Sequence, residues 1–166
     1  AVITLEGRGV FDLLQHSFTK DLLCCQGKTG APLAEGRSVY GLFLNSDGTV
    51  LDDAIIGKLG NDRYMIVVNS GMGSPVSAHL KELAEGEVAI TDHSDTLGKI
   101  DIQGPASARI MQTLIDDPES VLANMGYFSF KGDIFPGGSG SLTLKDGAEV
   151  ILSRTGYTGE FGFELF

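Results

Sequence analysis

Two adjacent carboxylates, Asp52 and Asp53, lie inside GTVLDDAIIG, an apolar run that is typical of a buried strand. A carboxylate in such a setting must be ion-paired, hydrogen-bonded or held at a ligand, because an unpaired buried charge is costly. Side chains alternate between the two faces of a strand, so Asp52 shares a face with Ala54, and Asp53 shares a face with Ile55. Both faces are apolar. Periodicity therefore leaves open which aspartate, if either, does chemistry and which accepts structural hydrogen bonds at a bulge.

Glu164 is a further carboxylate between apolar neighbours, in the segment SRTGYTGEFGFELF. One carboxylate can accept two hydrogen bonds at once from a flat heterocycle that carries an amino group beside a ring N–H. Charged residues are also common on edge strands, where they face water and guard the sheet. The segment therefore predicts either a pocket for such a heterocycle or an exposed edge-strand glutamate.

Two similar strand–helix units must position these carboxylates. VITLEG and GVFDLLQHSF predict a strand followed by an amphipathic helix. One face of this helix is apolar, and it carries Val10, Leu13, Leu14 and Phe18. KIDIQG and PASARIMQTLI repeat the layout at a constant offset of 97 residues, so that Gly104 matches Gly7. Pro105 suits the first turn of the second helix, where a missing N–H costs nothing.

A group of strands is expected after each of these helices. In the first half they are SVYGLFLN, TVLDDAIIGKL and RYMIVVN, separated by the turn signals SDG and GND. In the second half they are SGSLTLK, AEVILSRTG and EFGFELF. SPVSAHLKELA adds a helix, with Ser74 as its cap and Pro75 at its first position.

The sequence thus predicts an α+β fold of duplicated strand–helix–strand units with antiparallel sheets. The two pseudo-repeats cover about residues 1–90 and 91–166 of a single domain, 1–166. Two similar sheets create a cleft at their junction, which is the usual place for a small-molecule site.

Composition argues against several function classes. A formal net charge of −10 disfavours nucleic acid as a partner. We find no apolar stretch of about 18 residues that could span a membrane and no signal-peptide pattern. The neighbouring cysteines, Cys24 and Cys25, and three scattered histidines lack the spacing of a metal site. We expect a cytoplasmic protein that needs no membrane, nucleic acid or metal.

Several motifs together resemble the glycine cleavage T-protein family, the folate-dependent aminomethyltransferases. They are SVYGLFLNSDGTVLDDAII, YMIVVNS, IQGPAS and SRTGYTGEFGFEL, which occur in the family's order over nearly the whole chain. The resemblance implies tetrahydrofolate as cofactor and the lipoylated H-protein as partner. The implied reaction transfers the methylene carbon of an aminomethyl group from the lipoyl arm to tetrahydrofolate and releases ammonia.

The resemblance also assigns roles to five residues. It makes Asp52 the catalytic carboxylate and places Glu164 on the glutamate that holds the pterin ring. Tyr40, Asn69 and Tyr157 fall on positions that line the folate site. From the residues alone, the tyrosines could equally be half-buried strand aromatics and Asn69 could cap a strand end.

The sequence departs from the family pattern at Gly48-Thr49, where Gly-Gly is usual, and at Lys20, where asparagine is common. Family members are also considerably longer. The resemblance therefore implies a fragment that lacks the C-terminal domain and a folate-contacting arginine, and that is inactive by itself. In a eukaryote it implies the mitochondrial matrix as location.

Two relatives of the same fold stay open as alternatives. One is a demethylase that moves a methyl group from a sulfonium compound to tetrahydrofolate. The other is a non-catalytic folate-binding protein of iron–sulfur maintenance, whose cysteine motif is not in this sequence. A binding domain without catalysis is the remaining alternative.

Overall fold

The structure, a computed structural model, describes residues 1–28, 30–138 and 140–166. The chain divides into two compact units, Ala1–Gly98 and Lys99–Phe166. The pseudo-repeat boundary at about residue 90 stays a prediction, and the strand at that position pairs within the first unit. Among the described residues, no helix is long and apolar enough to cross a membrane.

The first unit is built on a five-stranded antiparallel sheet of order β2-β3-β4-β1-β5. Its strands are β1 (Val2–Glu6), β2 (Ser38–Leu44), β3 (Val50–Gly60), β4 (Arg63–Val68) and β5 (Ala89–Asp92). The three antiparallel strands predicted between residues 38 and 69 are confirmed. Strand β5 was not predicted, because most of its four residues are exposed and carry no apolar periodicity.

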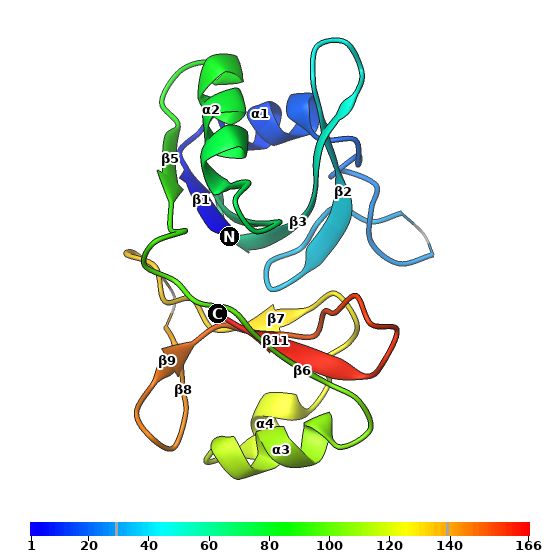
Figure 1. The fold of residues 1–166 in the computed structure, drawn as a ribbon, viewed down its shortest axis with the longest axis vertical. Helices are drawn as coiled ribbons and strands as arrows, with labels where there is room; N and C mark the ends of the chain where they lie inside the picture. Colours follow the sequence, from blue (N-terminus) through cyan, green and yellow to red (C-terminus); the bar gives the residue numbers. More distant parts are fainter. Residues whose placement is uncertain (29, 139) are drawn as a thin grey trace. The chain divides into compact units, whose positions relative to one another are not determined.

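Two helices of the first unit, α1 (Val10–Ser17) and α2 (Gly73–Leu83), pack their apolar faces on the core of this sheet (Figure 1). The predicted apolar face of α1 is confirmed, since Val10, Leu13, Leu14 and Phe18 are all buried. The predicted cap of α2 is wrong: the helix begins at Gly73, two residues before the predicted first position at Pro75, and Met72 takes the N-cap position without a side-chain bond. The reason is the turn after β4, in which the Met72 N–H bonds to the Asn69 carbonyl and starts the helix early.

The second unit holds a four-stranded antiparallel sheet of order β6-β11-β10-β7 and a separate β8–β9 hairpin. The sheet strands are β6 (Ile100–Gln103), β7 (Phe130–Lys131), β10 (Leu152–Ser153) and β11 (Gly162–Leu165), and the hairpin strands are β8 (Leu142–Thr143) and β9 (Glu149–Val150). Helices α3 (Ser107–Leu114) and α4 (Pro118–Leu122) complete the unit (Figure 1). Its core includes Met111, Ile115, Leu152 and Phe163.

Two strand predictions in the second unit are corrected. AEVILSRTG is not one strand, because its first part, β9, pairs with β8, whereas β10 pairs with β11 and β7. The change of partner falls at Ile151, whose N–H and carbonyl bond to Phe166. Of the predicted strand SGSLTLK only Leu142–Thr143 is a strand, and Ser139 lies outside the described residues. Strand β7 and helix α4 were missed because they are too short to show periodicity.

The two strand–helix repeats, β1–α1 and β6–α3, match each other at the predicted offset of 97 residues. Helices α1 and α3 begin 97 residues apart and have the same length. Each is preceded by a glycine with positive φ, 125° at Gly7 and 111° at Gly104. Pro105 lies just before the helix instead of in its first turn, because Ala106 is the N-cap.

Gly7→Ala is expected to destabilise the protein more than Gly104→Ala. Both backbones have φ values that L residues rarely adopt, so each substitution costs about 1–3 kcal/mol of strain. At Gly7 a Cβ atom would also lie 2.1 Å from the carbonyl oxygen of Glu87, whereas the space at Gly104 is open. Thermal unfolding of the two variants beside the unaltered protein measures the difference. Equal losses of stability would show that the backbone of Glu87 moves aside freely.

Candidate functional site

Strand β3 places the two aspartates on opposite faces of the first sheet. Asp52 is 7% exposed and lies on the buried face with Ala54 and Ile56, whereas Asp53 is exposed. The strand has β2 on one side and β4 on the other, which confirms the predicted internal position. Tertiary packing thus separates two carboxylates that the sequence pattern could not distinguish.

Asn69, the first residue after β4, hydrogen-bonds to both aspartates. Its backbone N–H donates to Oδ2 of Asp52 at 3.0 Å, and its side-chain Nδ2 donates to Oδ1 of Asp52 at 2.8 Å. The same Nδ2 donates to Oδ1 of Asp53 at 2.7 Å. One asparagine therefore donates hydrogen bonds to both neighbouring carboxylates, and its two N–H groups fix the orientation of Asp52.

Tyr40 lies on the face of Asp53 and not on that of Asp52. In the β2–β3 register Tyr40 pairs with Ile55, and Asp53 pairs with Leu42, so Tyr40 and Asp53 are diagonal neighbours on one face. Tyr40 is 50% exposed, and its hydroxyl is hydrogen-bonded to Asp53. Partial loss of water and the nearby charge of Asp53 raise the pKa of Tyr40, which keeps the phenol protonated.

Glu164 lies in the second unit and is 3% exposed. Its strand, β11, runs between β6 and β10, so the exposed edge-strand alternative is wrong. The Lys99 ammonium lies 2.5 Å from Oε1 of Glu164, and the Thr155 hydroxyl donates to Oε2. Each carboxylate oxygen thus has a donor, an ammonium on one and a hydroxyl on the other, as a buried charge requires.

Lys99, which precedes β6, is a member of this cluster that sequence reasoning missed. Its ammonium also lies 3.3 Å from Oδ2 of Asp101 and 5.7 Å from the ring centroid of Tyr157. Asp101 and Glu164 are directly paired across β6 and β11, and the Lys99 ammonium, which contacts both carboxylates, reduces the repulsion between these two like charges. Burial lowers the pKa of Lys99, but the hydrogen bond and charge of Glu164, together with Asp101, outweigh it and raise the pKa.

Gln103 holds the segment that carries Thr155 against the same sheet. Its Nε2 donates to the carbonyl oxygens of Thr155 and Phe163, each at 3.1 Å. A Cβ atom at Gly156 would lie 2.5 Å from Oε1 of Gln103, so the glycine permits this close approach. Tyr157, the next residue, is 83% exposed, which rules out the half-buried alternative for it.

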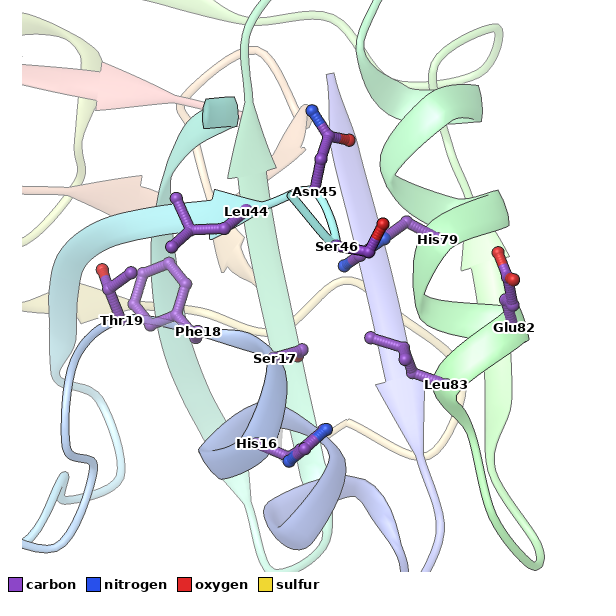
Figure 2. A pocket seen from close by; sticks show the side chains of 10 residues that line it. All are labelled: His16, Ser17, Phe18, Thr19, Leu44, Asn45, Ser46, His79, Glu82 and Leu83. Atoms are coloured by element: carbon purple, nitrogen blue, oxygen red, sulfur yellow. The ribbon is translucent and has the colours of Figure 1, made fainter. Parts of the chain in front are cut away.

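A cavity of about 560 Å³ lies elsewhere in the first unit, between the ends of α1 and α2 and the β2–β3 hairpin (Figure 2). Its polar lining includes His16, Asn45, His79 and Glu82, and none of the five residues singled out from the sequence lines it. Within the described parts of the chain, no group of three His, Cys, Asp or Glu residues could hold a metal ion. The predicted residues instead form two clusters, one in each unit: Tyr40, Asp52 and Asn69 with Asp53, and Tyr157 and Glu164 with Lys99.

Comparison with known proteins agrees with the fold and with the motif resemblance. Residues 1–166 match the model of the GCVT N-terminal domain. The chain is 35% identical over 164 residues to an aminomethyltransferase of Geobacillus kaustophilus. That alignment covers 99% of this chain and 40% of the relative. An aminomethyltransferase of Bacillus subtilis is 30% identical over 164 residues, and the alignment covers 99% of this chain and 40% of that protein.

A solved structure is similar as well. The crystal structure of glycine cleavage system aminomethyltransferase T from Bartonella henselae aligns with a TM-score of 0.64 at 26% identity, over 99% of this chain and 38% of that one. The predicted α+β class with antiparallel sheets is therefore confirmed. The chain spans about two-fifths of the length of the relatives that it matches.

Proposed function

The chain belongs to the family of GCVT N-terminal domains, and from this premise we propose that it serves tetrahydrofolate-dependent one-carbon transfer in the glycine cleavage system. The proposed reaction converts the aminomethyl-lipoyl H-protein and tetrahydrofolate into methylenetetrahydrofolate, ammonia and the dihydrolipoyl H-protein. Because the chain spans about two-fifths of its relatives, the activity is proposed for the complete product of the gene. The proposed location is the cytoplasm.

The observation that carries this proposal is the buried carboxylate of Glu164. An ionised carboxylate offers about four acceptor positions. Lys99 and Thr155 take one on each oxygen, so each oxygen keeps a position for a ligand N–H. Two such positions on one carboxylate suit the amino group and ring N–H of a pterin. The exposed Tyr157 ring, next to Lys99, offers a flat apolar face for the same ligand.

Asp52 supports the catalytic part of the proposal. Breaking the carbon–nitrogen bond of the aminomethyl group develops positive charge on carbon, and a fixed carboxylate in a dry setting stabilises such charge. The two N–H groups of Asn69 hold Asp52 in place before any reaction, so no reorganisation is needed. Tetrahydrofolate would supply the nitrogens that take up the one-carbon unit.

The complete gene product, supplied with aminomethyl-lipoyl H-protein and tetrahydrofolate, is expected to release ammonia and to form methylenetetrahydrofolate in equal amounts. Omission of tetrahydrofolate or of the lipoyl group should abolish formation of methylenetetrahydrofolate. Methyl transfer from a sulfonium compound in place of this reaction would support the demethylase alternative. Folate binding without turnover of either donor would support the non-catalytic one.

A further inference from the structure

The ammonium of Lys99 has one N–H to spare beside Glu164. A lysine ammonium carries three N–H donors. Glu164 and Asp101 accept from it at 2.5 and 3.3 Å, and within the described residues no third acceptor is recorded. The Lys99 side chain is 31% exposed, whereas that of Glu164 is 4% exposed. A ligand that approaches Glu164 therefore meets the Lys99 ammonium next to the carboxylate.

Lys99 and Glu164 together present one donor followed by two acceptors. The edge of a 2-amino-4-oxopterin has the complementary order, with a carbonyl oxygen, a ring N–H and an amino group side by side. We propose that Lys99 donates to the 4-oxo group while Glu164 accepts the two N–H groups, so that Lys99 selects 4-oxopterins over 4-aminopteridines. This inference rests on the proposed folate function of the Glu164 cluster and deepens it.

The selectivity has a simple physical origin. A 4-amino group would turn a donor toward the Lys99 ammonium, which is itself only a donor, and two facing donors leave both N–H groups unpaired. The ring nitrogen N3 of such an analogue also carries no hydrogen, so Glu164 loses one of its two N–H partners, and the share of Lys99 is the part of the selectivity that depends on its ammonium. Turning the ammonium away from the ligand would cost free energy, because Asp101 and Glu164 hold it from one side and the Tyr157 ring lies 5.7 Å away. A site built to hydrogen-bond a given group rejects an analogue that cannot make the bond.

Calorimetry with two matched ligands tests the inference on the complete gene product. The ligands are tetrahydrofolate and its 4-amino-4-deoxy analogue, and the unaltered protein is expected to prefer the first by more than about tenfold, because the analogue loses the bond from Lys99 and the N3–H bond to Glu164. The part of this preference that Lys99→Met removes measures the contribution of Lys99. Lys99→Met should weaken tetrahydrofolate binding by about tenfold and leave the analogue unchanged or tighter. Lys145→Met, which removes an exposed lysine of the β8–β9 hairpin, is the matched control and should change neither affinity.

Three other outcomes of this experiment would overturn the inference. Equal affinity of the unaltered protein for both ligands would do so without any variant, so the test survives if Lys99→Met fails to fold. Parallel weakening of both ligands in Lys99→Met would mean that Lys99 only supports Glu164 and selects nothing. If the unaltered protein bound neither ligand, the proposed function would fail as well, which distinguishes that failure from failure of the Lys99 inference alone.

Discussion

Asp52→Asn is expected to lower the turnover of the complete gene product by about a hundredfold or more, which is the range seen when a preorganised electrostatic group is lost. The carboxylate is 7% exposed and held by Asn69, so its charge acts in a setting where water screens it little. The asparagine has nearly the same shape but no charge. Ammonia release under saturating tetrahydrofolate measures the effect.

Asp53→Asn is the matched control, because it removes an equal charge one residue away on the exposed face. Its effect on turnover should be much milder. In Asp52→Asn one new N–H must face an N–H of Asn69, and Asn69 cannot turn its amide without losing the bond to Asp53. A modest loss of thermal stability is therefore expected in Asp52→Asn, and unfolding curves are needed beside the kinetics. Equal loss of turnover in the two variants would contradict the assignment to Asp52.

Glu164→Gln is expected to weaken tetrahydrofolate binding by roughly 2–4 kcal/mol, the sum of a lost charge-assisted bond and a misplaced donor. The new amide presents N–H toward the N–H groups of the pterin or toward a resident donor, Lys99 or Thr155. The variant also leaves the Lys99 ammonium without its nearest carboxylate, although Asp101 remains at 3.3 Å. Calorimetry on the complete gene product gives the affinity directly.

Glu160→Gln is the control for this substitution, because Glu160 belongs to the same segment but is exposed. It should leave tetrahydrofolate affinity unchanged. If Glu164→Gln bound tetrahydrofolate as well as the unaltered protein, the buried carboxylate would be a purely structural partner of Lys99. The proposed function would then lose the observation that carries it.

Local patterns in the sequence were sufficient for much of the fold. The helix at Val10–Ser17, its apolar face and its counterpart 97 residues later follow from helical periodicity, which depends only on neighbours along the chain. Strands β2, β3 and β4 follow from apolar runs bounded by tight turns, for the same reason. The short strands β5 and β7 carry no such pattern and exist because a neighbouring strand supplies their hydrogen bonds.

The sequence by itself determined the α+β class, the family resemblance and the carboxylates worth testing, because residue types, spacing and motifs are properties of the chain alone. Only the tertiary structure decided that Asp52 faces the core and Asp53 faces water, since both faces of that strand are apolar in sequence. It also decided that Glu164 is buried and paired with Lys99. That contact depends on the pairing of β6 with β11, and no local pattern specifies hydrogen bonds between strands so far apart along the chain.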